Sequence, residues 1–212
     1  ALTEAIDAIK SEVAAGNKSQ EDALAEIIAL LESGALAGGG SGSGGEGEGG
    51  EGESSYQSIT ITTSKAIGET LIVTVQGELA ASEVEGAVIK DSETHENGCT
   101  EYTFELTSQT VTIKQASIEY ILFTLDQITS VDLNNSPDLK SLYCYWNAIK
   151  GENMTNLVNS LPDRTGKTAG KFVVYATGAS REENVITKAE VAIAKAKNWN
   201  VLDWDNKEYA GI

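Results

Sequence analysis

An apolar pattern that repeats every ten or eleven residues, from Ile118 to Ile149, constrains the fold of this chain more than any other feature of its sequence. The stretch is IEYILFTLDQITSVDLNNSPDLKSLYCYWNAI. Each unit has apolar residues at its first, fourth and sixth positions: Ile118, Ile121 and Phe123, then Ile128, Val131 and Leu133, then Leu139, Leu142 and Cys144. Such a period predicts units that stack in space and bury these residues in one continuous core.

The length of each unit limits what it can contain. Ten or eleven residues are too few for a strand and a helix, so each unit is predicted to hold one short strand and one turn. Asn147 follows the strand of the last unit, and Asp126 and Ser136 occupy the same position in the two earlier units. A polar side chain at this position can bond turn backbone groups that would otherwise lack partners.

After the repeats, helix and strand patterns alternate over longer intervals. ENMTNLVNSL and TKAEVAIAKAKNW predict helices, the second with Thr187 as its N-cap, and KFVVY and NVLDW predict strands. The strands at Leu142, Phe172 and Val201 lie 30 and 29 residues apart, which suits two strand–helix coils that extend the repeats. Three aromatic residues are expected to close the far end of this region by packing: Trp199, Trp204 and Tyr209.

Residues 56–115 predict a β-rich N-terminal cap. SITITTS, ETLIVTVQG, YTFEL and TVTIK alternate apolar with polar residues and favour β-branched types. A stack of repeats must cover the apolar end of its first unit, and these strands precede the repeats directly. We therefore expect residues 116–212 to form the repeat region with its C-terminal cap, and residues 56–115 to cover its start.

The first 55 residues predict a separate, tethered unit. Residues 1–35 have two apolar stripes at helical spacing, interrupted at Gly16, and predict a helical hairpin. Residues 36–55 are rich in Gly, Ser and Glu and predict a flexible linker. Helices this short are marginally stable alone. The two helices of the hairpin are therefore expected to pack against each other or to dock on the main domain. The alternative is self-association of the chain through residues 1–35.

Composition narrows the classes of partner. The net charge of −17 disfavours nucleic acid and anionic membrane surfaces, both of which require basic patches. No apolar run approaches the length of a membrane-spanning helix. Cys99 and Cys144 are the only cysteines, and we expect both to be free, with Cys144 acting as a small apolar residue at an inward position.

No motif predicts catalysis, a cofactor or a metal site. His95 is the single histidine and lies in the polar stretch DSETHENG, where an exposed loop histidine is expected. A Ser/His/Asp triad would have to use His95, and no second histidine is present to complete a zinc site. DLNNSPD lacks the glycine and the final glutamate of a calcium loop, which favours a turn. With 32 acidic residues, counting alone does not exclude a pair of catalytic carboxyl groups.

LKSLYCYWNAI and ITSVDLNNSPDL resemble the L-T-S-L-x-C-x-x-N-Q-L and L-T-S-L-D-V-S-x-N-x-x-L repeats of leucine-rich repeat surface proteins from Bacteroidetes, of the nested, IRREKO-like type. YTFELTSQTVTIK resembles the strand that introduces such repeats, and EENVITKAEVAIAKAKNWNVLDWDN resembles their C-terminal cap. The resemblance covers about residues 57–210. It implies an α/β fold, namely a short leucine-rich repeat solenoid with a β-rich N-terminal cap and C-terminal strand–helix coils, preceded here by the tethered hairpin.

The resemblance also implies a function and a location. Members of that family are mostly exported, often as lipoproteins, and bind proteins or glycans without catalysis. We therefore expect a non-catalytic extracellular recognition module, exposed outside the cell or on the outer membrane after removal of an export segment. The candidate ligand-binding residues are Leu122, Tyr143, Tyr145 and Trp146, which lie between inward positions. The alternative is a structural component in which the hairpin assembles and displays the repeat domain.

Overall fold

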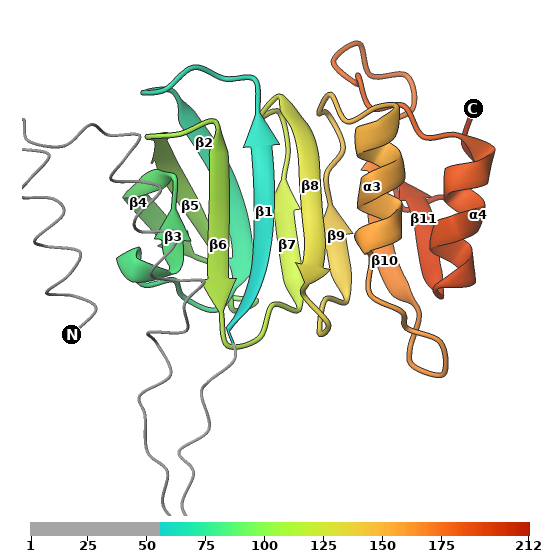
Figure 1. Ribbon diagram of the computed structural model, residues 1–212, viewed down its shortest axis with the longest axis horizontal. Coiled ribbons are helices and arrows are strands. Elements are labelled where there is room, and N and C mark those ends of the chain that lie inside the picture. Colours follow the sequence, from blue (N-terminus) through green and yellow to red (C-terminus); the bar gives the residue numbers. More distant parts are fainter. Residues whose placement is uncertain (1–55) are drawn as a thin grey trace, which may run out of the picture. The chain divides into compact units, whose positions relative to one another are not determined.

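Two β-sheets form the framework of the computed structural model, which describes residues 56–212 (Figure 1). The expected hairpin at 1–35 and linker at 36–55 lie outside the described residues. Sheet A has the strand order β3, β6, β1, β8: Val84–Glu85, Thr110–Gln115, Gln57–Thr63 and Ile128–Asn135. Sheet B has the order β11, β10, β9, β7, β2, β5, β4: Trp199–Asp203, Gly170–Tyr175, Ser141–Tyr143, Tyr120–Phe123, Thr70–Gln76, Cys99–Leu106 and Ala87–Thr94.

The antiparallel part of the fold follows from strict alternation in the sequence. In β1 (QSITITT) the isoleucines at 59 and 61 are fully buried, while Thr60 and Thr62, which alternate with them, face outward. Ile61 lies opposite Val111 of β6 on one side and Val131 of β8 on the other. Sheet A therefore joins strands that are distant in sequence into one apolar inner face.

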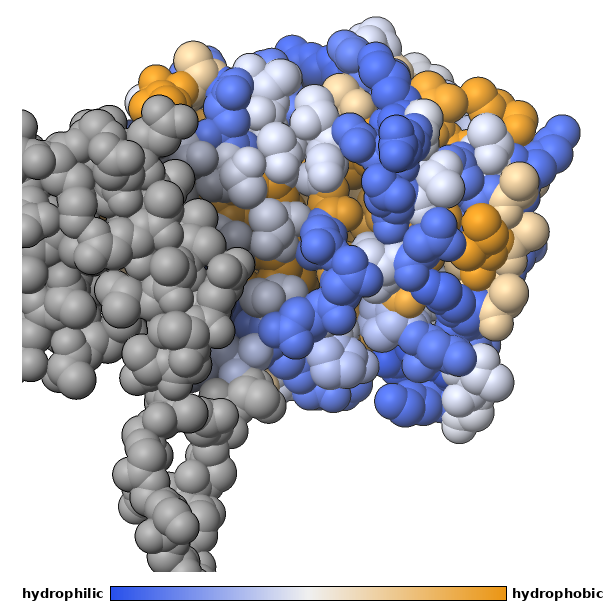
Figure 2. Space-filling model, viewed as in Figure 1, coloured by the Kyte–Doolittle hydropathy of each residue, from blue (hydrophilic) through white to orange (hydrophobic). Residues whose placement is uncertain are grey.

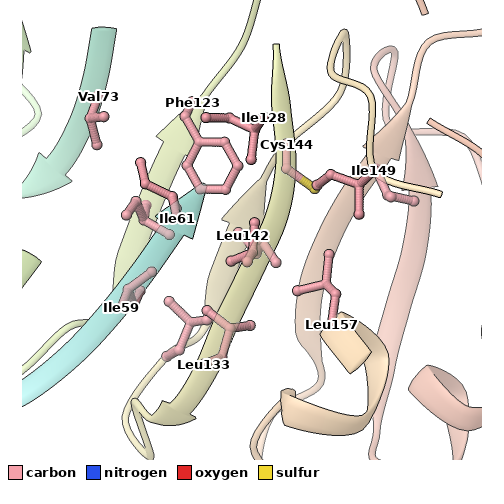
Figure 3. Close-up of a cluster of buried hydrophobic side chains, with 14 of the residues drawn as sticks. Ile59, Ile61, Val73, Phe123, Ile128, Leu133, Leu142, Cys144, Ile149 and Leu157 are labelled. Atoms are coloured by element: carbon pink, nitrogen blue, oxygen red, sulfur yellow. The ribbon is translucent and has the colours of Figure 1, made fainter. Parts of the chain in front are cut away.

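The second half of sheet B is parallel. β7, β9, β10 and β11 run in the same direction, with direct pairings between β7 and β9, β9 and β10, and β10 and β11. Their inward residues form one row across the four strands, and each is fully buried: Ile121, Leu142, Phe172 and Val201. Figure 3 shows this core from the side, with Ile59 and Ile61 of β1, Phe123 of β7, Leu142 of β9 and Leu157 of α3 converging on it.

Two α-helices cover the parallel half where sheet A ends. Helix α3 is Glu152–Ser160 and α4 is Lys188–Ala196, and a short 3₁₀ helix, η1, spans Ala81–Glu83. Thr187 caps α4 as the sequence predicts: its side chain accepts a hydrogen bond from Glu190 N. Met154, Leu157 and Val158 form the buried stripe of α3.

Two outer edges of the sheets, at β8 of sheet A and at β11 of sheet B, are closed by hydrogen bonds. Leu133 N of β8 donates to Ser160 Oγ at 3.2 Å, and Asn153 Nδ2 donates to the Thr129 carbonyl oxygen at 2.9 Å, so α3 occupies the free side of β8. At the other end, Tyr209 N donates to the Val201 carbonyl oxygen at 3.0 Å along β11. Among the described strands, β4 is the opposite edge strand of sheet B, and it has a bulge between Ile89 and Asp91.

The expected α/β solenoid is wrong. Strands account for 41% of the described residues and helices for 13%, and the strands form sheets of four and seven members. The apolar period reflects strands that alternate between two sheets, with β7 and β9 in sheet B and β8 in sheet A. Residues 56–115 contribute to the same two sheets, because β1 pairs with β8 and β2 pairs with β7. The spacing of inward residues carried no information about these long-range antiparallel partners.

Candidate functional site

The outer surface of the parallel half of sheet B gathers aromatic residues in rows. Tyr120 of β7, Ser141 of β9 and Lys171 of β10 share one row, since Ser141 pairs with both neighbours. The next row contains Leu122, Tyr143, Val173 and Leu202. Tyr145 and Tyr175 lie two residues beyond Tyr143 and Val173, on the same face. We call this surface the aromatic face: Tyr120, Leu122, Tyr143, Tyr145, Lys171, Val173, Tyr175 and Leu202.

The side chains of the aromatic face pack on one another. The rings of Tyr120 and Tyr143 are 5.4 Å apart between centroids, and Lys171 Nζ lies 5.0 Å from the Tyr143 ring centre. Val173 points outward but is 0% exposed, so its neighbours cover it completely. Tyr175 stacks on Tyr209 at 4.5 Å. The result is a pre-packed layer of rings with partly exposed surfaces.

Burial raises the pKa of two phenols in this layer, those of Tyr120 and Tyr209. Burial first, and then the neighbouring Tyr143, raise the pKa of Tyr120 well above its ordinary value. Burial also raises the pKa of Tyr209 to about 12, with a further contribution from Tyr175. Both hydroxyl groups therefore carry a proton throughout the physiological range and can donate a hydrogen bond.

A second group of aromatic residues lies where the parallel strands end. The carboxyl ends of parallel strands meet at the same edge of a sheet, and the residues after β9 and β11 place Trp146 and Trp204 there. Their ring centroids are 6.2 Å apart, and Trp146 also contacts Tyr145 edge to face at 5.0 Å. We call Trp146, Trp204, Tyr209 and the adjoining Asp203 the strand-end site.

The backbone at this edge adopts unusual conformations. Leu125 and Trp146 have φ values of 62° and 59°, in the left-handed region that residues with a side chain rarely adopt. Leu125 N donates to the Trp146 carbonyl oxygen at 3.1 Å, which links the two turns. Two large apolar side chains are thus held at positions where glycine would be favoured, a pattern that is enriched at functional sites.

Two buried asparagines hold these turns. Asn147 Oδ1 accepts from Ile128 N at 3.0 Å, and its amide nitrogen donates to the carbonyl oxygens of Phe123 and Cys144 at 3.0 Å each. Asn184 Oδ1 accepts from Ile149 N at 2.8 Å. These side chains satisfy backbone groups that the strands leave unpaired, as expected for Asn147 from its position in the repeat.

Glu182 supports the turn that carries Trp146. Its two carboxyl oxygens accept from Trp146 N at 2.9 Å and from Asn184 N at 2.8 Å. Burial raises the pKa of Glu182, although these backbone donors oppose the effect. The carboxyl group therefore acts as a fixed acceptor for the backbone N–H groups of Trp146 and Asn184.

Several cavities are lined by residues at the strand ends. One of about 440 Å³ is lined by residues that include Gln127, Trp146 and Arg181, and an adjoining one of about 500 Å³ by Leu125, Trp146 and Arg181 among others. A third, of about 410 Å³, is lined by Asp203, Trp204 and Tyr209 with four polar neighbours. Volumes of this size are typical of small-ligand pockets, roughly 300–1,000 Å³.

The structure brings the sequence-predicted residues together and adds others. Leu122 and Tyr143 are direct register partners, and Tyr145 and Trp146 continue from Tyr143 toward the strand end. The sequence reasoning missed Tyr120 and Tyr175, although the alternation that marked Tyr143 as outward applies equally to them. It also assigned Trp204 to end packing, whereas that side chain is 50% exposed.

The opposite face has a different character. Figure 2 shows the side that carries β6, β1, β8 and α3, where hydrophilic and intermediate residues dominate and hydrophobic ones form small separate groups. Cross-strand threonines account for part of this surface, with Thr60 and Thr112 hydroxyls 3.0 Å apart. Over residues 56–212, no cluster of three or more His, Cys, Asp or Glu side chains is arranged to hold a metal ion. His95 lies exposed in the turn between β4 and β5.

Comparison with known proteins gives no relative: no family model, no curated protein and no solved structure matches this chain. None of the helices in the described part of the chain is long and apolar enough to span a membrane.

Proposed function

We propose that residues 56–212 form a non-catalytic recognition module that binds a protein or glycan ligand through the aromatic face. The observation that supports this most is the segregation of aromatic side chains: five of the seven tyrosines lie on the aromatic face or stack on it, namely Tyr120, Tyr143, Tyr145, Tyr175 and Tyr209. Tyrosines are enriched in binding surfaces because they offer a large apolar body and a polar tip at low entropic cost.

The packing of this face supports binding rather than simple core formation. The inward row of the same strands already fills the core with fully buried aliphatic and aromatic residues. The outward tyrosines therefore add nothing to that interior, yet they are ordered against one another before any ligand arrives. A pre-organised surface loses less conformational entropy on binding than a flexible one. We propose an extracellular location on the sequence resemblance alone.

The test is capture by the immobilised chain on arrays of glycans and of extracellular protein domains. We expect at least one ligand to be captured, and the double substitution Y143A/Y145A to abolish that capture. The matched control is T60A/T112A, which removes a pair of side chains from the opposite face. Both variants should retain the cooperative thermal transition of the parent chain.

Two results would count against the proposal. Capture that survives Y143A/Y145A but is lost in T60A/T112A would move the binding surface to sheet A. An absence of any captured ligand on both arrays, with the chain shown to be folded, would remove the support for a recognition function.

A further inference from the structure

The carboxyl group of Asp203 has an unused acceptor inside the strand-end site. Asp203 is 5% exposed, and its Oδ2 accepts from Thr177 N at 2.9 Å and from the Thr177 hydroxyl. Its Oδ1 is buried and has no hydrogen-bond partner, although the residue lines the pocket of about 410 Å³. A buried oxygen without a donor costs about 1–3 kcal/mol. A ligand that supplies a donor here would recover that loss.

Trp146 presents the complementary deficiency. Its indole Nε1 is also buried without an acceptor. Trp146 lines the cavities of about 440 and 500 Å³, not the one that Asp203 lines, and its ring is 6.2 Å from that of Trp204. The strand-end site therefore lacks a donor for Asp203 Oδ1 and an acceptor for Trp146 Nε1. An ammonium or guanidinium group can only donate, whereas a hydroxyl group donates and accepts. A hydroxyl group can therefore satisfy either unpaired atom, whereas a cation can satisfy only Asp203 Oδ1.

The charges around the pocket favour a neutral ligand. Asp205 and Glu208 line it together with Asp203, but each is already paired with a lysine: Asp205 with Lys207 at 2.5 Å, and Glu208 with Lys195. Of the three carboxyl groups, only that of Asp203 is left without a lysine partner, which weakens the attraction of the pocket for a polycation. The rings supply the rest of the recognition surface, because the faces of pyranose rings carry C–H groups that stack on indole and phenol rings.

We infer that the pocket lined by Asp203, Trp204 and Tyr209 is a subsite for one residue of a neutral saccharide, with Trp204 and Tyr209 as stacking surfaces and Asp203 Oδ1 as the hydroxyl acceptor. This rests on the recognition function proposed above and names its ligand class. The aromatic face, which continues from Trp146 through Tyr145 to Tyr143, then provides the path for the remaining residues of an oligosaccharide.

The experiment titrates the full chain with neutral hexasaccharides of glucose, mannose, galactose and xylose, followed by tryptophan fluorescence and calorimetry, with hexalysine as the cationic comparison. At least one saccharide should bind with a change in tryptophan emission. W204A and D203N should each raise its Kd about tenfold or more, because stacking surface or the acceptor is lost. Y56A is the matched control, since Tyr56 and Trp204 are each 50% exposed; its Kd should be unchanged.

The alternatives give different results. Binding of hexalysine that D203N abolishes, with no saccharide bound, would replace the saccharide by a basic peptide and overturn the inference. Saccharide binding that W204A and D203N leave unchanged would move the ligand away from the strand ends. If no saccharide binds while Y143A/Y145A still abolishes capture on the arrays, the subsite is lost but the recognition function stands. If saccharide binding depends on Trp204 and Asp203 but not on the two tyrosines, the subsite stands and the broader binding face is lost.

Discussion

Asn147 and Asn184 donate to the same carbonyl oxygen, that of Cys144, at 3.0 Å and 2.8 Å. The two asparagines come from different turns and are 37 residues apart in the sequence. Cys144 lies at the end of β9, immediately before the turn that carries Trp146. A single backbone atom therefore links the turns on either side of the strand-end site.

This shared acceptor predicts coupled energetics. N147A and N184A should each lower the free energy of unfolding by about 3 kcal/mol, because each leaves several buried backbone groups without partners. Each single variant still leaves one donor on the Cys144 carbonyl oxygen, whereas the double variant removes both. The double variant should therefore lose about 1 kcal/mol more than the sum of the two. Urea unfolding measures all three, with N200A, an exposed asparagine on β11, as the near-neutral control. Additive losses would contradict the coupling.

The buried pair of Lys65 and Asp126 predicts a defined pH dependence. Lys65 Nζ lies 2.6 Å from Asp126 Oδ1, and their side chains are 15% and 3% exposed. K65M should cost about 3 kcal/mol at neutral pH, because it leaves a buried carboxylate without its partner. Burial already raises the pKa of Asp126 above its ordinary value of 3.8, against the opposing effect of Lys65, and K65M raises it further.

The sign of that dependence follows from proton linkage. With its folded-state pKa above the unfolded value, Asp126 binds a proton more tightly in the folded chain, so its contribution to stability falls as the pH rises through the interval above 3.8. The interval should extend to higher pH in K65M than in the parent chain. The free energy of unfolding of K65M, measured by urea from pH 4 to pH 7 at about unit intervals, should fall more steeply than that of the parent. K65M/D126N should remove the extra slope; an identical slope in all three chains would show that Asp126 does not titrate in this way.

Gly86 should be irreplaceable. It has a φ of +82°, and a Cβ at this position would lie 2.0 Å from the Thr110 carbonyl oxygen. G86A should therefore lower the free energy of unfolding by at least about 3 kcal/mol. Gly68 is the control: its φ is +89° but nothing lies within 4 Å of the added atom, so G68A should cost only about 1 kcal/mol. Equal losses in thermal unfolding would mean that backbone conformation, not the close approach, limits position 86.

The two free cysteines should differ in reactivity. Cys144 is fully buried and burial raises the pKa of its thiol, whereas Cys99 is partly exposed at the start of β5. We expect a thiol-specific chromogenic reagent to modify Cys99 in the folded chain, and to modify Cys144 only at the rate of unfolding. C99S should abolish the fast phase and leave the slow one. A fast phase that persists in C99S would show that the core around Cys144 opens readily.

Local signals in the sequence anticipated many inward positions but not the partners of the strands. Alternation marks Ile59, Ile121 and Leu142 as inward, and Thr187 is recognisable as a helix cap, because each property depends on near neighbours. That β1 lies between β6 and β8 depends on pairings 48 to 77 residues apart, which alternation does not encode. The fold class was wrong for this reason.

The residues of the candidate site were likewise predictable only where local sequence pattern determines their position. Tyr143 and Leu122 were predictable as outward residues from the repeat, and they are register partners in the sheet. Asn184 lies in a loop without apolar periodicity, and its partners, such as Cys144, are up to 40 residues away. The unpaired Asp203 oxygen could not be predicted either, since Asp203 occupies an inward position of β11 where an apolar residue is usual.

The closed edges at β8 and β11 bear on self-assembly. Helix α3 occupies the free side of β8, and the segment after β11 pairs back along it, so neither edge offers backbone groups to another molecule. At the other end, β3 has only two residues, which leaves β4 as the one long edge strand within residues 56–212. Endless strand-to-strand growth requires two open edges on each subunit. With one, the described region can at most pair edge to edge into a closed dimer, and cannot propagate into a fibre by this route.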